Sequence, residues 1–514
     1  MKKILYLFML PLMSLLFTGC DGNNPTNNTG TNTETNTGDD DNDLVENQTW
    51  SSSVSIVWNG TTATVTGTVD SVTIENSNGY VTVTSTAKYV AYNVSGSGTG
   101  QLSIYSDYKF KLALNGLTLS CSDGPAINNQ CHKRCYVVLS GSNTLSDGSS
   151  YASSTEDRKA AFFSEGQLCF SGSGSLNITG NYKHALASDD YIRLCEGTGT
   201  ITLTAKASDG MHSNDGIIIN DGTVTITAVE EGIQCDTSSV VITGGKITIT
   251  SSSDKGILAY GNIEISGGTI DITSKAKCIK TQSNLIISDG DITAVCTGTS
   301  SGGGWGGSSS GVTPEGIEAK GTMTISGGKV YAQASDDAIN SGGDMTISGG
   351  CVCAYSTGND GLDANGNCYI KGGVVYAIGA SSPEVAIDAN TESGYKLYIQ
   401  GGTIVAIGGL ESGSSLTQSC YSASSWNKST WYGLTVGSDI FAFKTPSSAG
   451  STLVVSGAST PTLSSGVTAS GTSIFNNMGY YPATASGGSS VSLSSYSGGN
   501  SGGGPGGQGG GGHR

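Results

Sequence analysis

A short pattern recurs along the chain with a nearly constant period. When its copies are aligned on their central apolar residue, successive members lie 22 to 25 residues apart, except for one step of 38. The longer step contains a Gly/Ser/Trp insert at residues 302–311. The aligned apolar residues are Phe162, Leu186, Met211, Ile233, Ile257, Ile279, Ile317, Ile339, Leu362 and Ile387.

Each copy holds three short apolar runs separated by Gly-Gly or Asp-Gly corners, as around Ile339, Met345 and Val352. Leucine-rich repeats need a Leu-rich strand plus a helix, and no 3.6-residue helical period is present. Propeller blades need about 40 residues each. The sequence therefore predicts an all-β fold, a right-handed parallel β-helix of about ten or more coils with β caps at both ends.

Composition changes along the chain divide it into six segments. Residues 21–48 contain almost no apolar side chains, and residues 498–514 are rich in Gly, so both are predicted to be disordered. The full prediction is a lipoprotein signal peptide at 1–20, a disordered tether at 21–48, an N-terminal β cap with the first coils at 49–125, the parallel β-helix at 126–408, a C-terminal β-rich cap or small domain at 409–497 and a Gly-rich disordered tail at 498–514.

The N-terminus has the pattern of an export signal. Lys2 and Lys3 precede an apolar run, residues 4–17, that is too short to span a membrane. The run closes with Phe-Thr-Gly-Cys, which resembles a bacterial lipoprotein signal with Cys20 lipidated after cleavage; an ordinary secretory signal is the alternative. We therefore expect an exported protein, lipid-anchored to the bacterial outer membrane or cell surface.

The repeat also predicts which side chains point outward. The aligned apolar residue and the residue two positions later should point into the core. The residue just before it should then point outward, and it is always small. These small residues would form a shallow floor along the surface with acidic borders. The predicted floor consists of Gly210, Gly232, Gly256, Cys278, Gly316, Ala338, Gly361 and Ala386.

The acidic borders predict a cation. Carboxylates one coil apart, about 4.8 Å, repel each other by roughly 3 kcal/mol at an effective dielectric of 20. No lysine occupies the border columns between Glu315 and Asp388, and calcium prefers carboxylate and carbonyl oxygens. For any single Asp the alternative role is to form the turn. The predicted calcium ligands are Asp209, Glu230, Glu231, Asp254, Glu315, Glu318, Asp336, Asp337, Asp360, Asp363 and Asp388.

Aromatic side chains supply the candidate sugar contacts. Tyr369 and Tyr398 occupy equivalent outward positions on adjacent coils, and Tyr331 and Tyr376 lie in a second column. Trp305 lies in the Gly-rich insert. Aromatic rings on neighbouring strands also stabilise a sheet, which is the alternative role of these residues.

The chain contains thirteen cysteines. Cys235 and Cys368 fall in inward columns and are predicted to be core residues. Cys121, Cys131 and Cys135 lie close in sequence, which predicts one disulfide in an exported protein.

Enzymatic motifs are sparse. A calcium-dependent polysaccharide lyase needs the ion to acidify a sugar proton and a Lys or Arg base beside it. Lys255, Lys277 and Lys280, near two acidic residues, are the grouping that fits, and salt bridges between coils explain it equally well.

Several segments resemble a bacterial β-helical carbohydrate-binding family over roughly residues 52–480. They are Leu-Asn-Gly-Leu-Thr-Leu at 114–119, Ser-Asp-Gly-Pro-Ala-Ile at 122–127, Asn-Thr-Leu-Ser-Asp-Gly at 143–148, Gly-Asn-Tyr at 180–182, and the repeated Asp-Gly-Ile and Ile-Ser-Gly-Gly copies. The resemblance implies an extracellular, often lipid-anchored protein with a pectate-lyase-like fold. It also implies binding of cellulose and acidic polysaccharide with calcium, without established cleavage.

We therefore expect a lipid-anchored carbohydrate-binding protein for plant-type or acidic polysaccharide, acting with calcium. A calcium-dependent polysaccharide lyase and a structural surface adhesin are the alternatives. The net charge of −17 argues against a nucleic-acid partner. The expected partners are a polysaccharide and, through the lipid only, a membrane, and we expect a monomer.

Overall fold

The computed structural model describes residues 42–299, 313–423 and 425–498, which belong to one compact unit. Within these ranges all regular structure is β, apart from two short 3-10 turns, η1 (Val45–Asn47) and η2 (Thr391–Ser393). No helix in these ranges is long and apolar enough to cross a membrane. The predicted signal peptide, the insert at 302–311 and all but the first residue of the Gly-rich tail lie outside the described residues.

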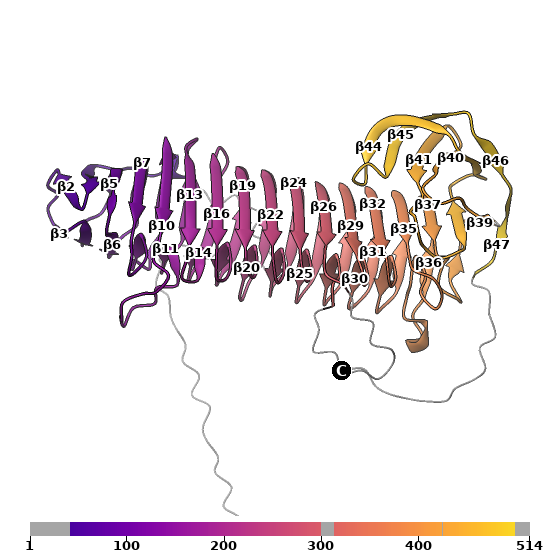
Figure 1. Ribbon diagram of the computed structural model, residues 1–514, viewed down its shortest axis with the longest axis horizontal. Helices are drawn as coiled ribbons and strands as arrows, with labels where there is room; N and C mark the ends of the chain where they lie inside the picture. Colours follow the sequence, from indigo (N-terminus) through magenta and orange to yellow (C-terminus); the bar gives the residue numbers. More distant parts are fainter. Residues whose placement is uncertain (1–41, 300–312, 424, 499–514) are drawn as a thin grey trace, which may run out of the picture. The chain divides into compact units, whose positions relative to one another are not determined.

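The predicted parallel β-helix is confirmed. Its coils stack through parallel strands (Figure 1), and we distinguish three faces, one for each strand of a coil. A typical coil consists of β30 (Ile339–Ser341) on the first face, β31 (Met345–Ile347) on the second and β32 (Cys351–Ser356) on the third. These are the three apolar runs that the sequence pattern contains.

The first face carries twelve coils of parallel strands in the described residues. In order they are β4 (Tyr80–Ser85), β6 (Gln101–Ser106), β8 (Ile127–Asn129), β11 (Ala160–Ser164), β14 (His184–Ser188), β17 (Met211–Ser213), β20 (Ile233–Cys235), β23 (Ile257–Ala259), β25 (Ile279–Thr281), β27 (Ile317–Ala319), β30 and β33 (Leu362–Ala364). Isolated bridges extend the stack through Ile387 to Leu410.

The second and third faces are joined at several coils by long continuous strands. These are β5 (Val90–Thr99), β7 (Phe110–Ser120), β24 (Ile263–Ser274) and β26 (Leu285–Cys296). The remaining second-face strands are β9 (Cys135–Ser140), β12 (Leu168–Ser171), β15 (Tyr191–Leu194), β18 (Gly216–Ile219), β21 (Val240–Ile242), β28 (Met323–Ile325), β31, β34 (Cys368–Ile370), β36 (Leu397–Ile399) and β38 (Ser415–Leu416). Those of the third face are β10 (Ser142–Ser146), β13 (Ser175–Gly180), β16 (Thr200–Ala205), β19 (Thr223–Ala228), β22 (Lys246–Ser251), β29 (Lys329–Ala334), β32, β35 (Val374–Ile378) and β37 (Thr403–Ile407).

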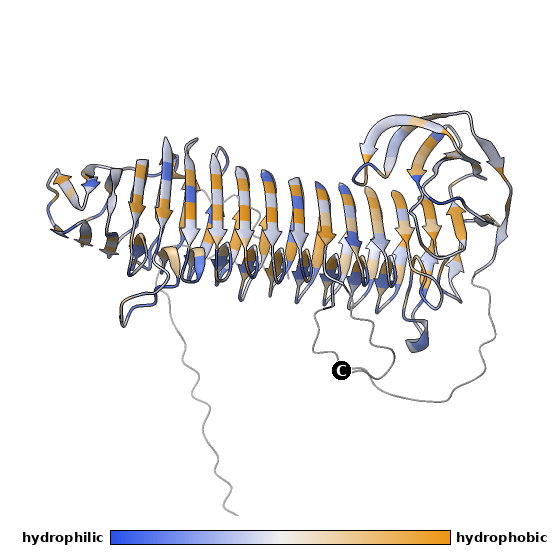
Figure 2. Cartoon of the chain, in the orientation of Figure 1, coloured by the Kyte–Doolittle hydropathy of each residue, from blue (hydrophilic) through white to orange (hydrophobic). Residues whose placement is uncertain are grey.

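The core follows from alternation along these strands. In β19 every second residue is buried, so apolar and polar bands alternate along the central strands in Figure 2. One continuous cluster of buried apolar side chains runs from Val54 to Val454. Cys235 and Cys368 belong to it, as predicted. The second glycine of a Gly-Gly corner lies close to the preceding coil. Gly350, for example, has φ +75°, and a Cβ on it would lie 2.6 Å from the carbonyl oxygen of Gly327.

Antiparallel strands flank both ends of the stack. At the N-terminal end β1 (Ser52–Gly60) pairs antiparallel with β2 (Thr62–Thr66), and β3 (Val72–Ser77) pairs antiparallel with β4. At the other end β42 (Leu453–Ser456) pairs antiparallel with β37 and with β39 (Cys420–Ala423), which also pairs with β47 (Leu493–Tyr496).

A separate six-stranded antiparallel sheet follows the coils. It contains β40 (Trp431–Val436), β41 (Asp439–Lys444), β43 (Thr462–Ser465), β44 (Thr468–Ile474), β45 (Gly479–Ser486) and β46 (Ser489–Val491). Its apolar side chains, among them Phe441 and Phe443, pack on outward side chains of the third-face strands β29 to β37. This packing explains why β35 is buried at every residue.

Two sequence-based expectations are corrected here. Residues 42–48, the end of the predicted disordered tether, are ordered because Asp43 is buried between Arg134 (2.7 Å) and Arg193 (2.8 Å). The disulfide expected among the three N-terminal cysteines is not formed, and the twelve cysteines in the described part of the chain are all unpaired.

Candidate functional site

Two columns of mostly polar side chains run along the outer side of the first face. In each coil one side chain comes from two positions before the inward apolar residue and the other from the position just after it. Side chains of the two columns contact each other, so both columns lie on the same surface. The first outer column is His184, Asp209, Glu231, Lys255, Lys277, Glu315, Asp337 and Asp360, and the second is His212, Gln234, Leu258, Lys280, Glu318, Asn340, Asp363 and Asp388.

The predicted outward floor of small residues is wrong, because these residues point into the core. A Cβ on Gly210 would meet Cγ2 of Ile226 at 2.1 Å, and one on Gly232 would meet Cγ2 of Ile249 at 2.2 Å. Ala338 is completely buried in the apolar cluster. First-face strands in these coils are only three residues long, so the in–out alternation stops at the corner that precedes them. The two polar columns therefore adjoin directly, without a floor between them.

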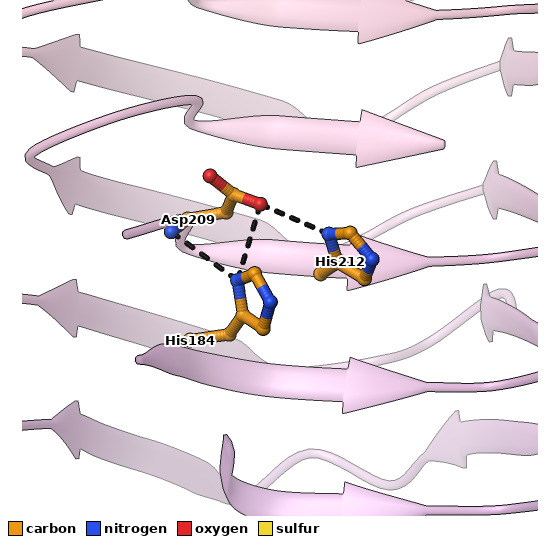
Figure 3. A group of neighbouring side chains, drawn as sticks. All are labelled: His184, Asp209 and His212. Atoms are coloured by element: carbon orange, nitrogen blue, oxygen red, sulfur yellow. Dashed lines mark hydrogen bonds and ion pairs between the residues drawn. The ribbon is translucent and has the colours of Figure 1, made fainter. Parts of the chain in front are cut away.

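The N-terminal part of the columns contains two histidines and a carboxylate (Figure 3). Oδ2 of Asp209 lies 3.1 Å from Nδ1 of His184 and 2.9 Å from Nδ1 of His212. Burial lowers the pKa of His184 to about 4, although Asp209 opposes this. Burial alone would raise the pKa of Asp209, but hydrogen bonds to both imidazoles hold it well below its usual value. Carboxylate oxygens of Glu230 and Glu231, two other predicted calcium ligands, lie within 4.8 Å of an Asp209 oxygen.

The middle of the columns is neutralised by lysines. Lys255 lies 2.9 Å from Glu231 and 2.7 Å from Asp254. Lys277 contacts both Glu315 and Glu318, and the Lys277–Glu318 distance is 2.8 Å. These predicted lyase lysines are thus held in ion pairs with predicted calcium ligands.

Burial and the lysine charges shift the carboxyl pKa values of this middle section in opposite directions. Burial raises the pKa of Glu315 to about 7 despite the contact with Lys277. For Glu318 burial acts in the same sense, but the ammonium groups of Lys277 and Lys320 outweigh it and lower the pKa to about 2. Lys280, 3.3 Å from Glu318, has a lowered pKa because it is buried.

The C-terminal part of the columns is acidic. Nδ2 of Asn340 donates to Asp337 (3.1 Å) and to Asp363 (2.7 Å), and no Lys or Arg of the described chain pairs with the carboxylates there. Burial first, and then neighbouring carboxylates, raise the pKa of Asp360 to about 7 and of Asp388 to about 9. Burial raises the pKa of Asp363 to about 6 and raises the pKa of Asp337 well above its usual value. We call Asp337, Asp360, Asp363 and Asp388 the acidic strip.

The acidic strip is organised by backbone donors. Asp360 accepts a hydrogen bond from the Val385 amide at 2.6 Å, and Asp337 accepts one from the Asp360 amide at 3.2 Å. Beside the strip, Asp336 accepts from Asn359 at 2.8 Å. Within the described residues, ligand atoms of three different side chains come within 4.8 Å of one another in the two groups around Asp209. A cation at the acidic strip would therefore need further oxygen ligands from outside the chain.

The predicted aromatic contacts separate into two kinds. The prediction that Tyr331 and Tyr376 contact sugar is wrong, because the C-terminal sheet covers both side chains. The Tyr376 hydroxyl donates a hydrogen bond to the Lys444 carbonyl at 2.9 Å. Tyr369 and Tyr398 are stacked on the second face with ring centroids 4.9 Å apart and planes 10° apart. Trp305 and Cys20, the predicted lipid site, lie outside the described residues.

Sequence reasoning missed two groups. One is the histidine pair, whose members stand at different offsets from Leu186 and Met211, so no single column contains both. The other is Tyr151 and the exposed Tyr182, whose rings stack at 4.1 Å. Tyr182 belongs to the Gly-Asn-Tyr motif noted in the sequence, which could have drawn attention to it.

The comparison with known families decides the identity of this β-helix. The model described as "Carbohydrate-binding domain-containing protein" matches residues 77–262 and 194–361, together more than half of the chain. The chain belongs to this family. The match to the carbohydrate-binding domain family spans β4 to β32 and thus most of both outer columns. It confirms the family resemblance and supports a function in carbohydrate binding.

One solved structure is similar to part of this chain. It is described as the polysaccharide lyase-like protein from C. thermocellum, gadolinium derivative, at 20% identity and a TM-score of 0.39. The similarity covers 53% of this chain and 96% of that chain. No curated protein matches the sequence.

Proposed function

We propose that this carbohydrate-binding protein holds acidic polysaccharide through calcium bound at the acidic strip. The observation that carries the proposal is the contrast between two parts of the same columns. Lysines neutralise the carboxylates in the middle coils, whereas the strip has four carboxyl groups on three successive coils without such partners among the described residues. Buried carboxylates that repel each other are stabilised by a cation.

The donor set fits calcium. Asp337, Asp360, Asp363 and Asp388 would hold the ion with carboxylate oxygens, the ligand type that calcium prefers. Calcium takes six to eight oxygens, more than this strip supplies at one point, so carboxylates of a uronic acid could complete the shell. Such sharing would let a protein with a net charge of −17 bind an anionic polymer.

A binding experiment tests this proposal. Protein would be retained on immobilised polygalacturonate, with insoluble cellulose as the neutral polymer, in calcium and then in chelator. We expect calcium-dependent retention on polygalacturonate, weakened at least about tenfold in the double variant Asp360→Asn/Asp363→Asn. Asp291→Asn, an exposed carboxylate on the third face, is the matched control and should bind like the parent. Retention that is the same with and without calcium, and the same for the parent and the double variant, would contradict the proposal. If excess soluble polymer releases the protein from the immobilised polymer, the interaction is glycan binding and not adhesion to a protein.

The export signal supports a lipid-anchored location on the outer membrane or cell surface. The supporting pattern is the short apolar run that ends in Cys20. Metabolic labelling with a fatty acid should mark the parent but not Cys20→Ser. Labelling of both proteins would contradict the proposed anchor site.

Lyase activity is the second candidate, favoured by the lowered pKa of Lys280. A lysine with a lowered pKa is a better general base at neutral pH. Incubation with polygalacturonate and calcium would then produce the ultraviolet absorbance of unsaturated uronides, and Lys280→Met should abolish it. Absence of this absorbance in the parent would contradict lyase activity on this polymer and favour carbohydrate binding without cleavage.

A further inference from the structure

The two histidines at the N-terminal end of the outer columns form an enclosed cluster. His184 begins β14, His212 lies in the next strand β17, and their rings stack with centroids 4.2 Å apart. Both Nδ1 atoms point at the same oxygen, Oδ2 of Asp209 (Figure 3). All three side chains are nearly inaccessible, with 2%, 3% and 7% exposed for His184, Asp209 and His212. Parallel stacking of coils thus places two nitrogen donors and one carboxylate oxygen in a closed space.

The carboxylate is held so that one oxygen is left for the histidines. Oδ1 of Asp209 accepts the Glu231 amide at 3.2 Å and the Ser208 hydroxyl at 3.3 Å. Oδ2 is shared by the two imidazoles. Nε2 of His184 is buried and has no hydrogen-bond partner among the described residues. Hydrogen bonding within the cluster therefore leaves one imidazole nitrogen unsatisfied, and it is not one of the two nitrogens that face Asp209.

We propose that His184, Asp209 and His212 bind a divalent transition metal of the zinc class through Nδ1, Oδ2 and Nδ1. Two imidazoles and one carboxylate are a donor set that zinc takes in proteins. Nitrogen donors also distinguish this site from the all-oxygen shell that calcium prefers.

The distances agree with such a site. Metal bonds of about 2.0–2.1 Å place tetrahedral ligands about 3.3–3.4 Å apart and octahedral neighbours about 2.9 Å apart. The observed Nδ1–Oδ2 separations of 3.1 and 2.9 Å lie close to this range. Metal binding would replace the hydrogen bond that the Asp209 amide donates to Nδ1 of His184 at 3.4 Å and the one between Nδ1 of His212 and Oδ2 of Asp209.

The surroundings supply orientation and further oxygens. Nε2 of His212 lies 3.3 Å from Asp236, and a metal-bound histidine commonly donates its second N–H to a carboxylate. Glu230 and Glu231 keep carboxylate oxygens within 4.8 Å of Asp209, in a group that shares only Asp209 with the histidine cluster. This site is separate from the acidic strip and independent of the proposed calcium binding.

Metal content tests the proposal directly. The full chain, purified without a polyhistidine tag, would be dialysed against zinc and its bound metal measured. We expect His212→Gln and Asp209→Asn to bind about one equivalent less zinc than the parent and to lose the zinc-dependent rise in Tm. His132→Gln is the matched control, because that side chain is 79% exposed and lies outside the cluster. Equal zinc content and equal Tm shifts in the parent and both cluster variants would overturn the proposal.

A second measurement separates the cluster from the cysteines and does not depend on a variant that folds. Cobalt bound to the parent should give visible bands typical of nitrogen and oxygen ligands, without the charge-transfer band of thiolates. Displacement of that cobalt by zinc but not by an excess of calcium is expected. Thiolate bands alone, or no cobalt binding, would show a hydrogen-bonded cluster without metal.

Discussion

Replacing Asp360 by asparagine is expected to stabilise the calcium-free protein at alkaline pH. Asp360 is 9% exposed, and burial together with nearby carboxylates raises its pKa from 3.8 to about 7. Asparagine keeps a carbonyl oxygen that can accept the Val385 amide, as Asp360 does at 2.6 Å. The substitution therefore removes a charge without removing the hydrogen bond.

The sign and size follow from proton linkage. Because the folded state holds the proton more tightly than the unfolded state, the free energy of unfolding falls as the pH rises from about 4 to about 7. A shift of about three pKa units, at about 1.4 kcal/mol each, amounts to about 4 kcal/mol above the folded-state pKa. The free energy of unfolding of the variant should thus exceed that of the parent by about 4 kcal/mol at pH 8 and by less than about 2 kcal/mol at pH 5.

Urea unfolding followed by circular dichroism, in chelator at both pH values, measures this difference. Asp291→Asn on the exposed third face is the control and should change the free energy of unfolding by less than about 0.5 kcal/mol. Calcium should reduce or reverse the advantage of Asp360→Asn, since the variant lacks a ligand. An equal difference at pH 5 and pH 8, or a variant less stable at pH 8 in chelator, would refute the electrostatic reasoning.

Three other substitutions test the packing of the coils. Lys277→Met should lower the free energy of unfolding by about 3–5 kcal/mol, because it leaves the buried carboxylate of Glu315 without its cation, whereas Glu318 keeps Lys280 and Lys320. Lys329→Met, in an exposed ion pair, should lower it by under about 1 kcal/mol in the same urea titration. Gly232→Ala should lower the free energy of unfolding by about 1–3 kcal/mol, because the added Cβ overpacks against Ile249. In a double-mutant cycle, Gly232→Ala/Ile249→Ala should lose less stability than the sum of the two single variants. Tyr376→Phe should lower stability by about 1 kcal/mol through its lost hydrogen bond, while polysaccharide retention stays that of the parent.

The period of the sequence was sufficient to predict the coils. Each copy places its apolar residue in register with the next, so that Ile317, Ile339 and Leu362 stack in one column as expected. The same pattern predicted that Glu318 and Asp363 would face outward on one surface. Regular repetition makes such local patterns reliable, because each coil contacts mainly its neighbours.

What the pattern could not predict depends on corners and on distant contacts. Gly210 turns inward because its strand begins only at the next residue, which alternation alone does not reveal. Tyr331 and Tyr376 look exposed from their position in a strand, yet they are covered by a sheet that begins more than 50 residues later. The pairing of His184 with His212 likewise required the corner geometry before β17.

The antiparallel strands at the two ends of the stack bear on how the protein behaves at high concentration. Open ends of a parallel ladder expose unpaired amides and carbonyls that can template the addition of another chain. At one end β2 lies against the middle of β1, and at the other β42 lies against β37 on the third face, both in the opposite direction to the coils. An incoming chain cannot continue the parallel register there, so these strands oppose end-to-end growth into amyloid-like fibrils.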